Sequence, residues 1–217
     1  MENWLITGAS GSMGTLCTEE LLSRNCHLHV FSRSPISISH KNLRNTLVES
    51  YSNLDFIGKT YRGIILAQGF FYFEELENLD NENCEALIEA NFISQINVVR
   101  SFLKSIEKNK RTDIVILGST SAFHAGRGTT VYGAAKAGML GFVRALNEEY
   151  VDTDVRFWFI STGTLANEMG AKVPNQDPNS LLDPALVAKR IIEAVTDESN
   201  LWEPEVTIRR RHIKLVN

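Results

Sequence analysis

Cysteine is scarce in this chain of 217 residues, and its three cysteines, Cys17, Cys26 and Cys84, lie far apart. No Cys-x-x-Cys pair and no Cys/His spacing typical of a metal site occurs, so we expect no bound metal. Unpaired cysteines of this kind are typical of proteins in a reducing compartment. We therefore expect free, buried thiols and a cytoplasmic location.

Long apolar runs and excess positive charge are also missing. No run reaches the roughly 18 apolar residues of a transmembrane helix, so we expect no membrane partner. The first residues lead into an apolar strand without the basic region and cleavage site of a signal peptide. The formal net charge is -4, which argues against nucleic acid as a partner because a phosphate backbone attracts basic proteins. We interpret the basic residues 209–212 as a solvated tail or the end of a last strand.

Short apolar runs alternate with longer amphipathic patterns. The runs predict strands at residues 4–6, 27–31, 46–50, 63–67, 113–118, 155–160 and 205–208. The amphipathic patterns predict helices at residues 13–24, 80–108, 131–150 and 183–195. This alternation predicts an α/β fold, a single Rossmann-type, doubly wound parallel sheet with helices on both faces, in one domain over residues 1–217. The polar segment 164–183 is expected to form a flap beyond the carboxyl ends of the strands, with disorder as the alternative.

A glycine-rich turn, residues 7–14, joins the first strand to the first helix. Glycine lets a backbone approach a pyrophosphate closely, and the N-terminus of a helix offers free N–H groups to the phosphate oxygens. An ordinary turn is the alternative. As a dinucleotide site, this turn would bind through Gly8, Ser10, Gly11, Ser12, Met13 and Gly14.

Ser32 and Arg33 follow the second strand, where an acidic residue would hold the ribose 2′-hydroxyl of NAD. A serine removes the carboxylate that would repel a phosphate, and an arginine can pair with a 2′-phosphate through two hydrogen bonds. The pair therefore favours NADP(H) over NAD(H). An arginine in a surface loop is the other interpretation.

Tyr132 and Lys136 are spaced by four residues and share one face of a predicted helix. A free tyrosine has a pKa of about 10, and a nearby ammonium favours the phenolate and lowers that value. Such a pair can exchange a proton with an alcohol or a carbonyl while a hydride moves.

Three further polar residues are candidates for the same site. Ser119 and Ser121 follow the strand at 113–118, where a hydroxyl can bind a substrate oxygen or cap a helix. Asn91 interrupts the apolar face of the helix at 80–108. A buried amide needs partners, so Asn91 either bonds to the backbone or holds a water near the site.

Together these residues resemble the short-chain dehydrogenase/reductase family, from Thr7 to the last strand. Asn91, Ser119, Tyr132 and Lys136 fall in the order and spacing of that family's catalytic tetrad, with Ser119 matching rather than Ser121. The resemblance implies that Tyr132 is the acid/base and that Lys136 lowers its pKa and holds the nicotinamide ribose. It implies that Ser119 positions and polarises the substrate oxygen and that Asn91 supports a water-linked proton path. Further implied cofactor contacts are Ala67, Gln68, Gly69, Thr162, Gly163 and Thr164, together with Tyr132 and Lys136.

The chain departs from the family pattern in several places. Ser12 replaces the middle glycine of the usual turn, and the resulting spacing resembles the family's extended branch. Leu-Ala-Gln-Gly at residues 66–69 stands where Asn-Asn-Ala-Gly is usual, and Thr162 with Gly163 replaces Pro-Gly. The connections at 32–45 and 51–61 are too short for the usual full helices.

These observations favour an NADP(H)-dependent carbonyl reductase or alcohol dehydrogenase that acts on a small molecule. One alternative is a non-catalytic or weakly catalytic dinucleotide-binding sensor or interaction module, and another is a nucleotide-sugar epimerase or dehydratase. We expect the substrate pocket near residues 70–73, 124–127 and 164–183. We also expect a homodimer or homotetramer formed through the helices at 80–108 and 131–150. The residues that motivate this interface are Gly138, Met139, Leu140, Gly141 and Phe142.

Overall fold

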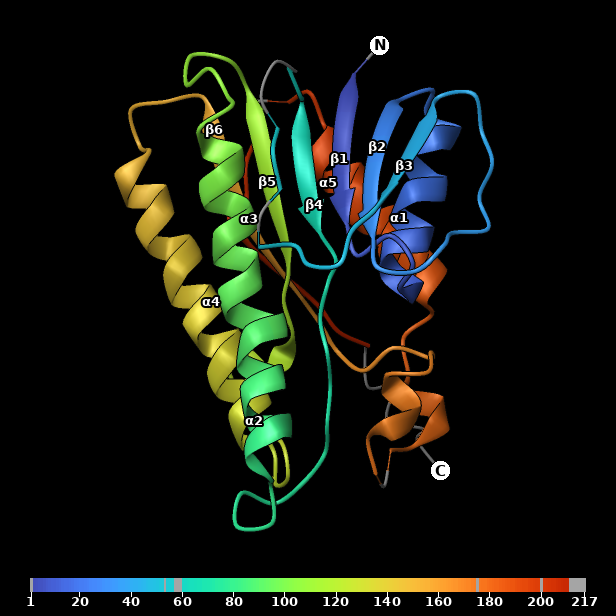
Figure 1. Ribbon diagram of the computed structural model, residues 1–217, viewed down its shortest axis with the longest axis vertical. Coiled ribbons are helices and arrows are strands. Elements are labelled where there is room, and N and C mark those ends of the chain that lie inside the picture. The colour runs from blue at the N-terminus through green and yellow to red at the C-terminus, as the bar shows by residue number, and fades with distance from the viewer. Residues whose placement is uncertain (1, 53, 57–59, 175, 200, 211–217) are drawn as a thin grey trace, which may run out of the picture.

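A seven-stranded parallel sheet organises the fold (Figure 1). The computed structural model describes residues 2–52, 54–56, 60–174, 176–199 and 201–210. The strands are β1 (Asn3–Thr7), β2 (His27–Ser32), β3 (Leu43–Leu47), β4 (Gly63–Leu66), β5 (Thr112–Leu117), β6 (Val155–Thr162) and β7 (Glu205–Ile208). Their order in the sheet is β3-β2-β1-β4-β5-β6-β7, and every pairing is parallel. The predicted doubly wound α/β fold is confirmed.

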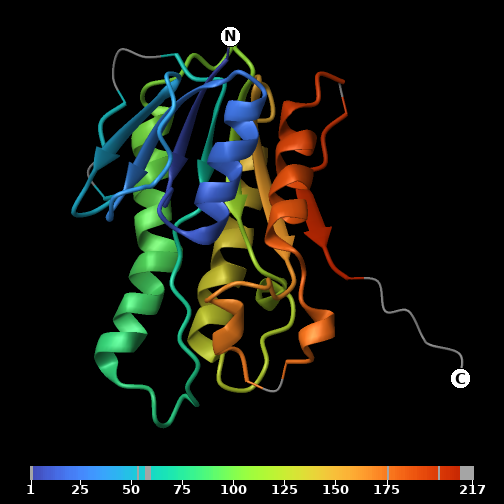
Figure 2. The ribbon, with the colours of Figure 1, turned by 90° about the vertical axis from the view of Figure 1, so that its right-hand side faces the viewer.

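Helices cover both faces of the sheet (Figure 2). One face carries α1 (Ser12–Ser23) and α5 (Pro184–Thr196), and the other carries α3 (Ser94–Leu103) and α4 (Thr130–Glu149). α2 (Asn81–Ile88) lies beyond the ends of the strands and packs against α4 (Figure 1). Alternate residues of each strand serve the two cores. In β1, Leu5 packs on the side of α3 and α4, whereas Trp4 and Ile6 pack on the side of α1 and α5. The central strands are therefore buried on both faces, as their continuous apolar runs predict.

The ends of α1 and α5 follow from local chemistry. Asn25 has a φ of 59° and follows the C-cap of α1, so it takes the left-handed conformation that commonly ends a helix. Asp183 caps α5 by accepting a hydrogen bond from the Ala185 N–H at 2.8 Å, and Pro184 occupies the first turn. Both signals were present in the sequence.

Two of the predicted elements are wrong in detail. The third strand was expected at 46–50, but β3 lies at Leu43–Leu47, where it pairs with β2 from Leu28 to Ser32. The helix expected over 80–108 is divided by a π-helical turn, η1 (Glu89–Ile93), and α3 ends at Leu103. A single inserted residue does not disturb the apolar periodicity enough to be visible in the sequence.

The described residues between β2 and β4 contain no helix, as the short connections predicted. The segment 48–56 instead places Tyr51, Leu54 and Phe56 in the core on the α3 side.

All three cysteines are free; Cys17 and Cys26 are buried and Cys84 is half-buried. Within the described residues, no helix combines the length and the apolar character needed to cross a bilayer.

Met139 and Leu140 are buried in the core of the chain. They were expected at a subunit interface, and that expectation is wrong because the inner face of α4 carries them toward the sheet.

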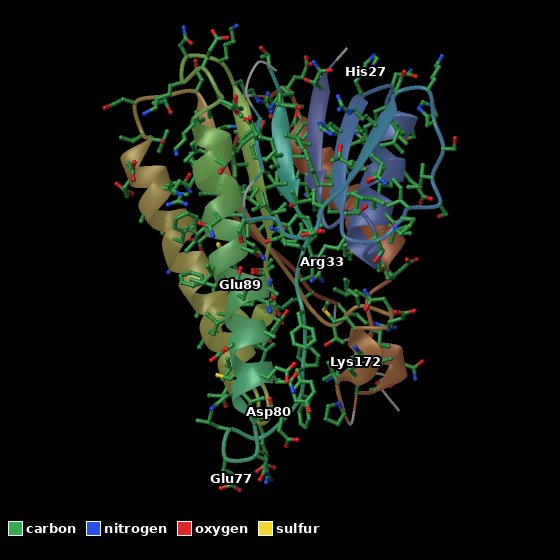
Figure 3. All side chains as sticks on the ribbon, viewed as in Figure 1. His27, Arg33, Glu77, Asp80, Glu89 and Lys172 are labelled. Carbon is green, nitrogen blue, oxygen red and sulfur yellow. The ribbon has the colours of Figure 1, made fainter. Side chains whose placement is uncertain are left out.

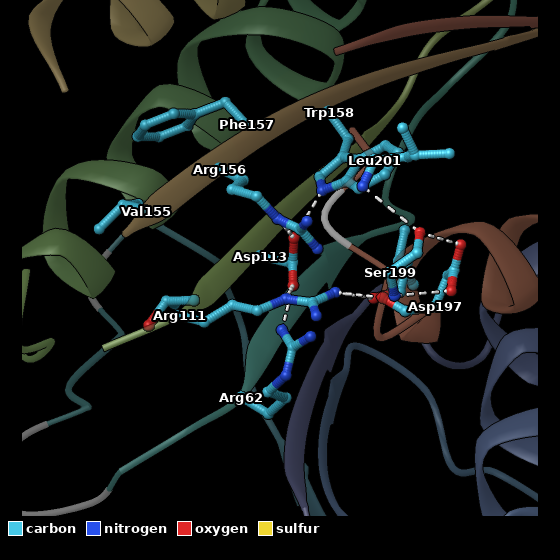
Figure 4. Close-up of polar contacts among 12 residues, drawn as sticks. Arg62, Arg111, Asp113, Val155, Arg156, Phe157, Trp158, Asp197, Ser199 and Leu201 are labelled. Atoms are coloured by element: carbon cyan, nitrogen blue, oxygen red, sulfur yellow. Dashed lines mark hydrogen bonds and ion pairs between the residues drawn. The ribbon is translucent and has the colours of Figure 1, made fainter. Parts of the chain in front are cut away.

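A buried carboxylate, Asp113, lies among three arginines and a tryptophan at the amino end of β5 (Figure 4). It accepts hydrogen bonds from Arg156 Nε and Trp158 Nε1, both at 2.7 Å, and forms an ion pair with Arg62. Arg111 Nε lies 3.4 Å from the same carboxylate, and its guanidinium donates to the Asp197 carbonyl oxygen at 2.7 Å. This network ties three strands and the end of α5 together on the side of the sheet away from the strands' carboxyl ends.

Candidate active site

The glycine-rich turn packs against the chain that leaves β4, at the point where the strand order reverses between β1 and β4. Gly8 has a φ of 77°, and a Cβ atom added to it would lie 2.5 Å from the Gln68 backbone nitrogen. A Cβ atom on Gly14 would lie 2.2 Å from the Gly8 carbonyl oxygen. Only glycine fits at both positions. Ligands of open α/β sheets bind in the crevice beside this switch point.

The first turn of α1 faces that crevice without a side-chain cap. Gly11 is the N-cap residue and provides no capping oxygen, and Ser10, Gly11 and Ser12 are exposed. Met13, by contrast, packs against the apolar core. The early N–H groups of a helix lack partners within the helix and carry partial positive charge, so this end attracts an anion.

Gln68 has an unsatisfied group at the switch point. The Thr7 hydroxyl donates to Gln68 Oε1, and Gln95 Nε2 donates to the Gln68 carbonyl oxygen at 3.0 Å. The buried Gln68 Nε2 has no hydrogen-bond partner among the described residues. A buried N–H is costly to leave unpaired, and a ligand bound in the crevice can satisfy it. The glycine contacts and this orphaned donor therefore fit a dinucleotide.

Ser32 and Arg33 differ in how they are placed at the end of β2. The Ser32 side chain is buried, and its hydroxyl donates to Asn45 Oδ1 at 3.1 Å, so it is engaged within the sheet. Arg33 is exposed and lies at the opposite end of β2 from His27 (Figure 3). Its side chain lies close to the Tyr51 hydroxyl.

Tyr132 lies in the first turn of α4, and its ring is 5.1 Å from that of Phe71 in an edge-to-face arrangement. Its hydroxyl lies close to the Ser119 side chain, which caps the short helix η2 (Thr120–Ala122) by accepting from the Ser121 N–H at 3.1 Å. The structure thus brings Ser119, and not Ser121, to the tyrosine. Burial raises the pKa of Tyr132, and the nearby Ser119 side chain opposes that rise.

Lys136 is buried one helical turn further along α4. Its Nζ lies 5.7 Å from the centre of the Tyr132 ring and donates to the Leu117 carbonyl oxygen at 3.2 Å. Burial lowers the pKa of Lys136 to about 8. The resemblance implied that Lys136 lowers the pKa of Tyr132, but in this structure burial outweighs any such effect and the tyrosine pKa is raised.

Asn91 occupies the middle of the π-helical turn and is fully buried. Its Nδ2 donates to the carbonyl oxygens of Phe70 at 2.6 Å and Leu87 at 3.0 Å. A Cβ atom on Gly69 would lie 3.1 Å from Asn91 Oδ1 and 3.9 Å from Lys136 Nζ, so both side chains flank this glycine. Of the two interpretations of Asn91, bonding to the backbone is the one that the structure displays.

The remaining expected cofactor residues lie at the same carboxyl edge. The Ala67 N–H donates to the Thr7 carbonyl oxygen at 3.0 Å, which brings the chain after β4 beside β1. Thr162 ends β6, and Gly163 and Thr164 lead into the polar segment. That segment folds back through a bridge between Leu165 and Leu182 and contains the short helices η3 (Gly170–Lys172) and η4 (Pro178–Ser180).

Apolar side chains surround Tyr132 on the expected substrate side. The aromatic stretch 70–73 contributes Phe71 to a cluster with Leu87 and Tyr132, and Phe70 and Tyr72 pack against it. Val173 of the polar segment packs there too. Of the stretch 124–127, Arg127 forms an ion pair with Glu75 at 2.6 Å, on the exposed rim of this region. Tyr51 was not predicted at this site, because it is a single tyrosine in a weakly patterned segment.

Comparisons with known proteins agree with this architecture. A family model for short chain dehydrogenases matches residues 37–178, beginning after the glycine-rich turn. An uncharacterized oxidoreductase of Staphylococcus saprophyticus is 22% identical over 231 residues, which cover 94% of this chain and 95% of the relative. An uncharacterized oxidoreductase of Saccharomyces cerevisiae is 25% identical over 162 residues, and the match spans 50% of that relative's length.

A solved structure has the same fold over nearly the whole chain. The alcohol dehydrogenase of Thermococcus sibiricus, complexed with 5-hydroxy-NADP, superposes with a TM-score of 0.82 at 20% identity, covering 98% of this chain and 99% of that one. The family match extends over more than half of the sequence and includes Asn91, Ser119, Tyr132 and Lys136. The chain therefore belongs to the short-chain dehydrogenase/reductase family of NAD(P)-dependent oxidoreductases.

Proposed function

We propose that this protein reduces a carbonyl group, or oxidises an alcohol, on a small molecule, with NADP(H) as its cofactor and Tyr132 as the acid/base. The observation that carries the proposal is the grouping of Ser119, Tyr132 and Lys136 beside the glycine-rich turn at the carboxyl edge of the sheet. A proton donor is thereby held close to the crevice in which a dinucleotide would bind.

The cofactor, when bound, supplies or accepts the hydride. The residues of the chain manage the proton and the substrate oxygen. The raised pKa of Tyr132 keeps its phenol protonated at neutral pH, and a protonated phenol is the form that donates to a developing alkoxide. The Ser119 side chain, which lies close to the Tyr132 hydroxyl, can orient the same oxygen. A lysine with a pKa of about 8 exchanges protons readily near neutral pH, which suits Lys136 to resupply the tyrosine.

The preference for NADP(H) is supported by Arg33, an exposed cation at the end of β2 without an acidic neighbour in the sequence. A 2′-phosphate can pair with a guanidinium there, whereas NAD(H) would find no carboxylate for its ribose. The apolar surroundings of Tyr132 favour a substrate with an apolar side. NAD(H) is kept as the alternative cofactor.

The first experiment compares binding and turnover in matched variants. NADPH and NADH are titrated by energy transfer from tryptophan, and NADPH oxidation is then followed with a panel of ketones and aldehydes. For Tyr132→Phe we expect NADPH binding to persist while turnover falls at least about 100-fold, as is typical when an acid/base residue is removed. Tyr150→Phe is the matched control, because Tyr150 is also buried and lies at the far end of α4.

Each failure has its own meaning. Full turnover in Tyr132→Phe would contradict the role of the tyrosine. Binding of NADPH without turnover on any substrate would favour the second candidate, a non-catalytic or weakly catalytic dinucleotide-binding sensor. The altered glycine-rich turn is the feature that supports this candidate.

A further inference from the structure

Tyr51 lies where β1 and β2 end, although it belongs to the segment that follows β3. The side chain is only 7% exposed and packs in the same apolar cluster as Phe31 and Phe56. Its hydroxyl lies close enough to interact with the backbone of Gly8 and with the backbone and side chain of Arg33. One tyrosine oxygen therefore joins the glycine-rich turn to the arginine expected to select the cofactor.

This position exists because the connection between β3 and β4 is short. With no helix among the described residues of the segment, the chain runs close under the ends of the strands, and Tyr51 reaches Gly8 and Arg33 directly. The Gly8 N–H also donates to the Phe31 carbonyl oxygen at 3.0 Å, which fixes the turn against the end of β2. The hydroxyl is thus held at the adenosine end of the proposed cofactor site.

We propose that Tyr51 is a positioning residue for cofactor selectivity, which holds the Arg33 guanidinium toward the 2′-phosphate of NADP(H). The inference rests on the proposed function, because it assigns a role within that same cofactor site. Arg33 forms no ion pair with any carboxylate in the described part of the chain. Its positive charge therefore remains available to a phosphate.

An anchor matters here because a free arginine side chain is mobile. An exposed arginine loses considerable rotamer freedom when it is fixed on a ligand, and fixing it beforehand reduces that loss. Because the Tyr51 ring is buried, its hydroxyl has a fixed position and restrains the guanidinium near Gly8. Burial also raises the pKa of Tyr51, so the hydroxyl stays neutral and leaves the positive charge of Arg33 uncompensated.

The test measures dissociation constants for NADPH and NADH in the full chain by tryptophan energy transfer. The proteins are the wild type, Tyr51→Phe, Arg33→Ala and the double variant. For Tyr51→Phe we expect NADPH binding to weaken about tenfold, the size expected for a lost polar contact with a charged group, while NADH binding changes less than about twofold. In the double variant NADPH should bind no more weakly than in Arg33→Ala, because the tyrosine acts through the arginine.

Tyr61→Phe is the matched control. Tyr61 is also a buried tyrosine of the same apolar cluster, but its hydroxyl lies 3.4 Å from His29 Nδ1 rather than near the glycine-rich turn. Both cofactors should bind this variant as they bind the wild type. If Tyr51→Phe fails to fold, Arg33→Lys tests the same pairing from the other side, and the expected result is again a loss confined to NADPH.

Three outcomes would overturn the inference. Equal weakening of both cofactors would make Tyr51 merely structural, and additive losses in the double variant would separate it from Arg33. Tighter binding of both cofactors would mean that the tyrosine occludes the site. If the wild type binds neither cofactor, the proposed function fails instead, so the two failures are distinguishable.

Discussion

Lys136 is buried, and burial of its ammonium group lowers the stability of the folded protein. The side chain is 4% exposed, and burial lowers its pKa from 10.5 to about 8. The charged form is therefore disfavoured in the folded state by roughly 3 kcal/mol. The cost is complete below pH 8, where Lys136 is charged in both states, and it disappears as the pH rises toward 10.5.

Lys136→Met is therefore expected to abolish turnover and yet to stabilise the protein at pH 7. Urea unfolding at pH 7 and at pH 9.5 provides the measurement, and the advantage of the variant should shrink at the higher pH. Lys189→Met, at a position exposed on α5, is the control and should show no such dependence. A variant less stable than the wild type at pH 7 would contradict the burial argument.

The candidate site shows which residue-scale features a sequence can reveal. Tyr132 and Lys136 were predictable because a spacing of four residues on a helix is local information. The direction of the Tyr132 pKa was not, since burial decides it and burial depends on Phe71, Leu87 and other distant residues. Tyr51 carries no local signal, because its partners Gly8 and Arg33 are brought to it only by the sheet.

At the scale of the β1–α1 turn, two neighbouring glycines should respond differently to the same substitution. In Gly14→Ala the new Cβ atom would lie 2.2 Å from the Gly8 carbonyl oxygen, so the backbone has to shift. In Gly11→Ala the nearest atom would be 3.4 Å away. We expect Gly14→Ala to lose about 1–3 kcal/mol of unfolding free energy and to weaken NADPH binding.

Gly11→Ala is the matched control for that prediction, with an expected loss below about 1 kcal/mol, mainly from a poorer N-cap residue. Chemical denaturation and NADPH titration of both variants provide the comparison. Similar losses in the two variants would show that the close packing of Gly14 against Gly8 is not what holds the turn together.

Elements with strong local signals were predicted well, and weak ones were not. The strand at Glu205–Ile208 and the helix beginning at Pro184 lie where they were expected. β3 was misplaced because the apolar residues Leu43, Leu47 and Val48 are too few to fix where the strand begins, and pairing with β2 decides its position. The π-helical turn was missed, although Asn91 on an apolar face was a signal that the helix there has a special role.

For the whole molecule, the Asp113 network provides a test that is separate from the active site. In Asp113→Asn the neighbouring arginines lose a fully buried countercharge, and we expect a loss of about 3–5 kcal/mol of unfolding free energy. Glu107→Gln, which removes the exposed ion pair with Lys110, should change stability by less than about 1 kcal/mol. Cofactor affinity of the folded Asp113→Asn protein should remain unchanged, and a small stability loss would mean that the network is only weakly coupled to folding.

Association of subunits is the second prediction at this scale. On the outer side of α3 and α4, Ile93 is 40% exposed, Phe92 and Phe142 are half-buried, and Gly141 is open to solvent. We propose that a second copy of the chain covers this face. Light scattering should give a dimeric or tetrameric mass for the wild type and a monomeric mass for Phe142→Glu. Leu186→Glu, at an exposed apolar position of α5, should not change the mass, and a monomeric wild type would contradict the proposal.

The short connections on either side of β3 also bear on how the two halves of the site behave in time. In the proposed cofactor site the nicotinamide half lies against α4, whose amides are protected by helical hydrogen bonds, whereas the described residues of segments 33–42 and 48–56 form no helix. Amide hydrogens of the adenosine half should therefore exchange with solvent faster, and NADPH should slow exchange mainly there. Part of the binding free energy would then be consumed in ordering that half, so measured affinity would understate the strength of the contacts at the phosphate.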